Sequence, residues 1–160
     1  MSCSNTPYNN ITYHKRIYLT QSSLRLIRMI TKGIKLLCKI AEDEIETITA
    51  KEAISISQSN ESVQLVDIRD IRELWREGAI PGAIHAPRGM LEFWVDPDSP
   101  YHKEVFASRK KFIFFCAGGL RSALATQTVQ NMGLKPVAHI EGGFSAWKDA
   151  GGSTVEKERK

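Results

Sequence analysis

The chain has 160 residues, of which 42% are hydrophobic and 25% are charged, and this composition is typical of a globular protein of one domain. Its net charge of +4 is unevenly distributed, because residues 1–41 contain seven Lys and Arg side chains and no Asp or Glu, whereas the remainder has a net charge of −3. Nucleic-acid binding by the remainder is therefore not expected. Three cysteines without a C-x-x-C spacing and four widely separated histidines predict no disulfide framework, no metal site and no cofactor.

The N-terminal segment is expected to lie outside the main domain. Residues 1–21 are small, polar and turn-prone, which predicts a disordered tail. Residues 22–44 have the pattern of a basic amphipathic helix, with an apolar face opposite a basic one. The apolar face comprises Ile27, Ile30, Ile34, Leu37 and Ala41, and the basic face comprises Arg25, Arg28, Lys32, Lys35 and Lys39.

Several roles are open for this helix. It is either a surface helix packed on the domain, a helix that lies on a membrane surface, or an organelle transit sequence, and translation from Met29 is a further alternative. The absence of an apolar run of about 18 residues argues against a membrane-spanning helix. We expect a cytoplasmic protein, with organelle targeting or membrane association through this segment as alternatives.

Beyond the N-terminal segment, strand and helix patterns alternate. Strands are predicted at 45–49, 63–68, 79–87, 111–116 and 136–143, and helices at 50–58, 70–78, 122–132 and 144–151. This alternation predicts an α/β domain, placed at 45–151, with a mostly parallel sheet covered by helices on both faces. Residues 88–109 are expected to form an elaborated loop, and the charged residues 152–160 a second disordered tail.

A cysteine stands where the most apolar strand ends. Cys116 follows the run Phe112–Phe115, and Gly118, Gly119 and Arg121 come directly after it, before a predicted helix. The glycines allow successive amide groups to turn inward, and the helix N-terminus and the arginine add positive charge. Such a cradle stabilises a thiolate, which is the nucleophilic form of cysteine. A small buried cysteine at the end of a strand would not need these neighbours.

The loop "CAGGLRSA" resembles the active-site loop of the rhodanese family of sulfurtransferases. Further elements follow in the order that this family has, namely "LVDIRD" at 65–70, "GAIPGAIHAP" at 78–87 and "EGGFSAW" at 141–147. The resemblance implies a rhodanese-like fold with a five-stranded sheet. It also implies that Cys116 carries sulfur as a persulfide, held by the loop Ala117, Gly118, Gly119, Leu120, Arg121 and Ser122.

The activity implied by the resemblance is sulfur transfer in two steps. A donor such as thiosulfate or a persulfide gives its outer sulfur to Cys116, and a thiol or cyanide then takes it; a persulfide-carrying protein is a further candidate partner. Four residues near the predicted site are candidates for the wall of the substrate pocket: His85, Arg88, Phe93 and Trp94. For His85 the preferred interpretation is a packed structural histidine, and an approach to the site is the alternative.

Two alternative functions fit part of the pattern. The first is a phosphatase or arsenate reductase on the same fold, but tyrosine-phosphatase loops place five residues between cysteine and arginine, and four separate Cys116 from Arg121. The second is a binding module without catalysis, as some rhodanese-like domains have become, but these often lack the cysteine.

Overall fold

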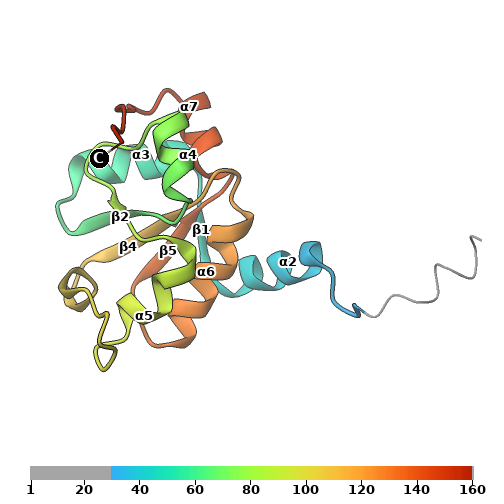
Figure 1. Ribbon diagram of the computed structural model, residues 1–160. Coiled ribbons are helices and arrows are strands. Elements are labelled where there is room, and N and C mark those ends of the chain that lie inside the picture. Colours follow the sequence, from blue (N-terminus) through green and yellow to red (C-terminus); the bar gives the residue numbers. More distant parts are fainter. Residues whose placement is uncertain (1–29, 160) are drawn as a thin grey trace, which may run out of the picture. The chain divides into compact units, whose positions relative to one another are not determined.

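The computed structural model describes residues 30–159, which contain a five-stranded sheet with all strands parallel (Figure 1). The strands lie in the order β1-β5-β4-β2-β3, so the most apolar strand, β4, is central. Their bounds are Glu46–Ile48 for β1, Val63–Asp67 for β2, Ile84–His85 for β3, Lys111–Phe115 for β4 and Val137–Ile140 for β5. The predicted α/β fold with a five-stranded, mostly parallel sheet is confirmed.

Helices cover both faces of the sheet. In Figure 1, α3 (Ala50–Ser59), α4 (Ile71–Glu77) and α7 (Gly143–Asp149) lie on one side, and α5 (Leu91–Val95) and α6 (Leu120–Asn131) on the other. Strand β4 explains why both faces must be covered, since Phe112 and Phe114 pack towards α5 and α6 while Ile113 and Phe115 pack towards α3 and α7. Residues in succession along a strand point to opposite faces, so an entirely apolar strand is stable only between two layers.

Helix α2 (Ile34–Glu44) is shorter than the helix predicted at 22–44. Its N-cap, Gly33, has an extended backbone, and residues 30–33 are not helical; residues 22–29, like the predicted tail at 1–21, lie outside the described residues. The predicted apolar face is also only partly buried. Ala41 packs against α6, whereas Ile34 is 56% exposed. The helix therefore contacts the domain mainly through its C-terminal half.

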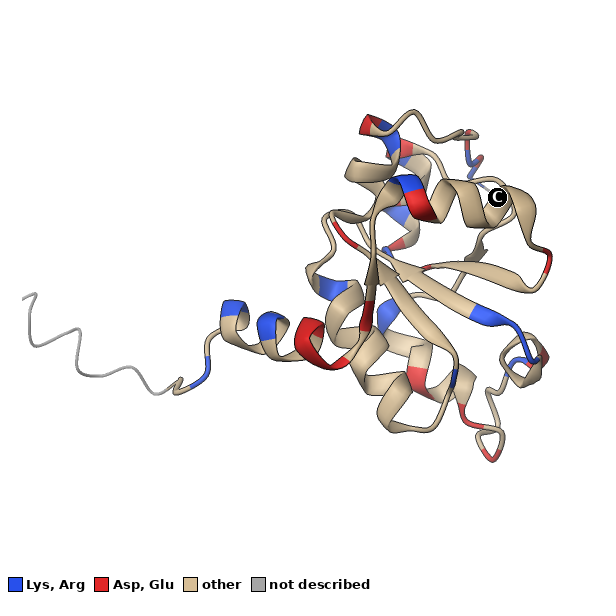
Figure 2. Cartoon of the chain, turned by 180° about the vertical axis from the view of Figure 1, so that it is seen from behind, with Lys and Arg blue, Asp and Glu red and all other residues tan. Residues whose placement is uncertain are grey.

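The charged side chains of α2 are placed unfavourably with respect to the helix dipole. Lysines lie in its N-terminal half and acidic residues in its C-terminal half, as Figure 2 shows, and no side chain caps its N-terminus. Because a helix dipole favours the reverse arrangement, α2 gains little stability from its own sequence and depends on its packing against α6. Among the described residues no helix has the length and apolar character needed to cross a membrane.

The expectation of a loop over 88–109 is wrong towards both ends of the segment, where residues 88–95 and 104–107 are helical. The segment contains the short helical turn η1 (Arg88–Met90), α5 and a second turn η2 (Glu104–Ala107). Leu91 and Val95 are four residues apart and both buried, which is a helical spacing, and Pro97 follows directly beyond the helix end. The two prolines at 97 and 100 mark the loop correctly only between α5 and η2.

The tail predicted to be disordered at 152–160 also forms specific contacts over part of its length. Val155 exchanges two backbone hydrogen bonds with Ala79, and the Trp147 indole donates to the Ser153 carbonyl at 3.0 Å. The Gly152 backbone lies so close to the Trp147 ring that a side chain could not be accommodated there. These contacts bring the chain from α7 back to the segment that precedes β3.

A buried histidine predicts how stability depends on pH. His139 on β5 is 1% exposed, and burial lowers its pKa to about 4. The unfolded chain takes up this proton below pH of about 6.5, whereas the folded chain does so only near pH 4. As the pH is lowered from about 6.5 to about 4, the free energy of unfolding should therefore fall by about 1.4 kcal/mol per pH unit. Urea unfolding of wild type and of His139→Gln across this range would measure it, and an unchanged slope in the variant would contradict the assignment.

Candidate active site

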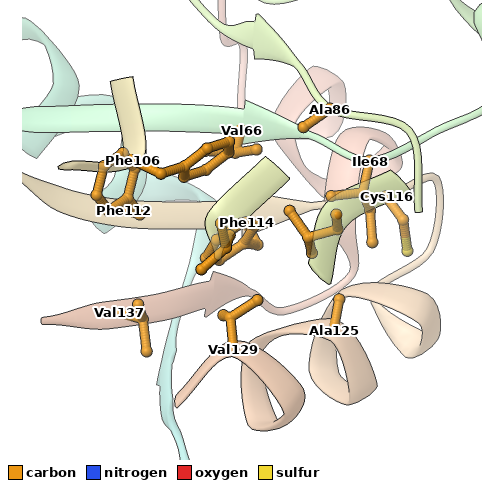
Figure 3. Packing of buried hydrophobic residues seen from close by; sticks show 12 residues of the cluster. Val66, Ile68, Ala86, Phe106, Phe112, Phe114, Cys116, Ala125, Val129 and Val137 are labelled. Carbon is orange, nitrogen blue, oxygen red and sulfur yellow. The ribbon is translucent and has the colours of Figure 1, made fainter. Parts of the chain in front are cut away.

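Cys116 lies at the carboxyl edge of the sheet, directly after β4. Its side chain belongs to a buried cluster that includes Ile68, which follows β2, and Ala86, which follows β3 (Figure 3). The carboxyl ends of neighbouring parallel strands form the usual ligand-binding edge of such sheets. Cys116 is only 1% exposed, so the thiol lies at the base of its loop rather than on an open surface.

The loop after Cys116 turns at Gly119. This glycine has φ of +94°, a conformation that side chains disfavour, and it forms the N-cap of α6. Its amide nitrogen lies 3.2 Å from the Cys116 sulfur and donates a hydrogen bond to it. Helix α6 begins at Leu120, two residues before the expected start at 122, and its first amide groups lack intrahelical acceptors. The sulfur is thus adjacent to the positive end of a twelve-residue helix.

Helix α7 holds the loop from behind. The amide of Phe144 donates to the Cys116 carbonyl oxygen at 2.7 Å, and the amide of Ser145 donates to the Ala117 carbonyl oxygen at 3.0 Å. Both donors belong to the first turn of α7, where amide groups have no partner within the helix. These two loop carbonyls therefore point towards α7. Because the amide of a peptide unit points away from its carbonyl, the amides of the same peptide units point towards the side on which the sulfur lies.

Close backbone contact between two loops requires a glycine at position 143. Gly143 has φ of +58°, and a Cβ atom there would overlap with the Cys116 carbonyl oxygen and lie 2.9 Å from the Gly119 nitrogen. The "EGG" sequence that follows β5 thus serves the loop that follows β4.

Arg121 is bound by an acidic residue that the sequence analysis did not identify. Its guanidinium donates from Nη1 to Glu73 Oε2 at 2.8 Å and from Nη2 to Glu73 Oε1 at 2.7 Å. Glu73 also accepts from the Asp70 amide as part of the capping box that starts α4. The D-x-x-E spacing at 70–73 could have predicted the cap. The ion pair joins residues 48 positions apart, which no local pattern reveals.

This ion pair changes the electrostatics expected at the loop. Hydrogen bonds from Arg121 hold the pKa of Glu73 below its usual range, so Glu73 is an anion at neutral pH. Glu73 is in turn the main cause of the raised pKa of Arg121, with a smaller contribution from Cys116. The positive charge of Arg121 is therefore balanced by a carboxylate, which the sequence did not predict.

The four candidate pocket residues occupy different environments. His85 is hydrogen-bonded through Nε2 to the Arg69 carbonyl oxygen at 2.8 Å, which fits the structural alternative. Arg88 pairs with Glu92 at 2.6 Å, and Trp94 packs against the buried cluster that contains Cys116. Phe93 is 53% exposed and lies edge-on to Tyr101. A role for these residues as a pocket wall stays a prediction.

A second cysteine lies against the outer side of the loop. Cys38 on α2 is buried, and its sulfur lies 3.7 Å from the Leu120 carbonyl oxygen, to which it donates. Burial, with a further effect of Glu42, raises the pKa of the Cys38 thiol, so it is protonated at neutral pH. Within residues 30–159, no group of three or more His, Cys, Asp or Glu side chains is arranged to hold a metal ion.

Comparison with known families agrees with this geometry. The model of the rhodanese-like domain matches residues 49–150. These residues include the whole of the Cys116 loop and four of the five strands, since only β1 lies outside the match. The chain belongs to the rhodanese-like family. The resemblance inferred from the sequence motifs is thereby confirmed.

Related rhodanese-like proteins include several that are named sulfurtransferases. YtwF of Bacillus subtilis, which is provisionally named a sulfurtransferase, is 33% identical over 105 residues, covering 66% of this chain and 89% of that protein. The thiosulfate sulfurtransferase GlpE of Shewanella oneidensis is 33% identical over 92 residues, which cover 56% of this chain and 79% of GlpE.

Two solved structures that resemble this chain are described as having different activities. A thiosulfate sulfurtransferase from Pseudomonas aeruginosa superposes with a TM-score of 0.66 at 26% identity, covering 79% of this chain and 23% of that one. A protein of unknown function from Rhodopseudomonas palustris, described as a possible tyrosine phosphatase, superposes with a TM-score of 0.78 at 58% identity, covering 80% and 98% of the two chains.

The contact between Gly143 and the loop can be tested by a single methyl group. Gly143→Ala should destabilise the protein by roughly 1–3 kcal/mol, because the Cβ atom displaces the loop backbone. Gly133→Ala is the matched control, since Gly133 also has positive φ (+102°) but has open space around it. Thermal unfolding of both variants measures the difference, and equal losses would show that backbone strain rather than the loop contact is responsible.

Proposed function

We propose that the protein is a sulfurtransferase that carries a sulfane sulfur on Cys116 as a persulfide. The main support is the arrangement of one thiol at the base of a short loop, with the Gly119 amide on its sulfur and the N-terminus of α6 beside it. A helix N-terminus and inward-facing amides stabilise both a thiolate and a terminal persulfide anion. Membership of a family with named sulfurtransferases adds to this support.

In the first step, the Cys116 thiolate attacks the outer sulfur of the donor. With thiosulfate, a bond forms between the two sulfurs, the original sulfur–sulfur bond breaks, and its electron pair leaves on sulfite. With a persulfide donor the leaving group is a thiolate. Neither leaving group needs a proton from the enzyme, so the absence of a positioned general acid at the Cys116 loop, within the described part of the chain, is compatible with this chemistry.

In the second step, an acceptor thiolate or cyanide attacks the outer sulfur of the Cys116 persulfide. The new bond is between acceptor and sulfane sulfur, and the electron pair of the broken bond returns to Cys116 as a thiolate. The enzyme therefore alternates between two forms in ping-pong fashion. Small thiols, cyanide and a cysteine on another protein all satisfy this chemistry.

A phosphatase is the second candidate, because the Rhodopseudomonas palustris relative is described as a possible one. Four residues separate Cys116 from Arg121, and the thiol is almost completely buried within that span. A cradle for a tetrahedral phosphate must surround three oxygen atoms, whereas a persulfide places one sulfur atom at the centre. Phosphate-ester cleavage also requires protonation of a poor leaving group. These points favour sulfur transfer.

Replacement of the thiol tests the proposal. Cys116→Ser should abolish the formation of thiocyanate from a sulfur donor and cyanide while the fold persists, because the hydroxyl is similar in size but stays protonated. Sulfur transfer by the variant at the wild-type rate would contradict the role of Cys116. Hydrolysis of p-nitrophenyl phosphate by wild type, without thiocyanate formation from any donor, would favour the phosphatase instead.

Cys38→Ser provides the matched control within the described residues. Cys38 donates to the Leu120 carbonyl, and a serine hydroxyl can keep this hydrogen bond, so activity should stay within about twofold of wild type. A loss as large as that of Cys116→Ser would identify Cys38 as a second redox-active thiol that the proposed mechanism lacks.

A further inference from the structure

The charges around the Cys116 loop are arranged in pairs. Arg121 makes two hydrogen bonds to Glu73; the Glu73 side chain is 17% exposed and the Arg121 side chain 42% exposed. The pair is thus partly buried, with the acidic partner on the inner side. Planar two-point contacts of this kind are the strongest geometry that arginine makes with a carboxylate. Glu73 is fixed from its other side by the Asp70 amide, so it has little freedom to leave.

Two further arginines at the same edge of the sheet also have carboxylate partners. Arg88, two residues after Ala86, contacts Glu92 at 2.6 Å, and Arg69, one residue after Ile68, contacts Asp67 at 2.7 Å. Each cation that follows β2, β3 or β4 at this edge therefore has its own carboxylate. A site built to attract a doubly charged anion would instead leave at least one arginine free to contact it.

Besides Arg121, backbone dipoles contribute positive potential at the sulfur. The Gly119 amide and the first turn of α6 together correspond to about half a unit charge. This is enough to stabilise one negative charge on a thiolate or persulfide. A second negative charge on the donor, such as that on the oxygens of thiosulfate, is repelled by the Glu73 carboxylate that pairs with Arg121.

We propose that Glu73 determines donor specificity: by pairing with Arg121 it favours sulfur donors that carry one negative charge, such as organic persulfides, over the thiosulfate dianion. This inference rests on the proposed sulfur transfer and names the donor class for it. Glu73 is a positioning residue, because it acts on the donor through Arg121 and not by touching the sulfur.

Two small donors separate charge from shape. Methanethiosulfonate differs from thiosulfate in having a methyl group in place of one charged oxygen, and so carries one negative charge fewer. The Cys116 thiolate attacks its outer sulfur, a bond forms between these sulfurs, and methanesulfinate leaves with the electron pair of the broken bond. The products are the same Cys116 persulfide and one sulfinate, so atoms and charge balance as they do for thiosulfate and sulfite.

The test is the ratio of kcat/KM for thiosulfate to kcat/KM for methanethiosulfonate, with cyanide as acceptor. Glu73→Gln removes the charge but keeps a side chain that can complete the capping box of α4, and it should raise the ratio about tenfold. Most of this change should be a lower KM for thiosulfate, and it should diminish at high salt. Glu73→Asp, which keeps the charge, should leave the ratio nearer to that of wild type.

Glu52→Gln is the matched control, because Glu52 closes the equivalent capping box at the start of α3 without an arginine partner. Its ratio should equal that of wild type. If Glu73→Gln lowers both kcat/KM values in parallel, or leaves the ratio unchanged, Glu73 has only a structural role and the inference is overturned while sulfur transfer stands. If wild type takes sulfur from neither of these donors nor from an organic persulfide such as glutathione persulfide, both the proposed function and the inference fail.

Discussion

The contact between the start of α7 and the Cys116 loop is the constraint on which the site depends. Strands β4 and β5 are neighbours, so the loops that follow them meet at the carboxyl edge of the sheet. Two amides of α7 bind the carbonyls of Cys116 and Ala117, and Gly143 allows the approach. Because a peptide unit presents its carbonyl and amide in opposite directions, fixing the carbonyls on one side disposes the amides around the sulfur on the other. The thiol thus owes much of its environment to backbone geometry, in addition to the Arg121 charge that Glu73 balances.

This origin of the positive potential has a chemical consequence. Backbone dipoles at a helix N-terminus stabilise a single negative charge close to them, and their effect falls off within one turn. Arg121 would extend the attraction to larger anions, but Glu73 balances it, and Arg88 and Arg69 are balanced too. Such a site suits a sulfur that carries its charge at the terminal atom. It suits less well a phosphate ester, whose charge is spread over several oxygens that each need a donor.

The sequence predicted most of the fold, because its strands are short apolar runs and its helices carry clear stop signals such as Gly78 and Gly133. It predicted the position of Cys116 because a strand end, glycines and an arginine are adjacent in the chain. It could not predict the Glu73–Arg121 pair or the contact of Cys38 with Leu120, which join residues 48 and 82 positions apart. The helix at 91–95 is hard to predict, because it spans little more than one turn and Pro97 and Pro100, which are typical of loops, follow closely.

The central claim is that Cys116 accepts and holds a single sulfur atom, and mass spectrometry of the Cys116 peptide tests it most directly. Wild-type protein incubated with methanethiosulfonate or thiosulfate, freed of excess donor and digested under non-reducing conditions, should contain the Cys116 peptide heavier by the mass of one sulfur atom. Cyanide should remove this mass and yield an equal amount of thiocyanate. A Cys116 peptide of unchanged mass after both donors, or added sulfur found only on another cysteine, would contradict the account.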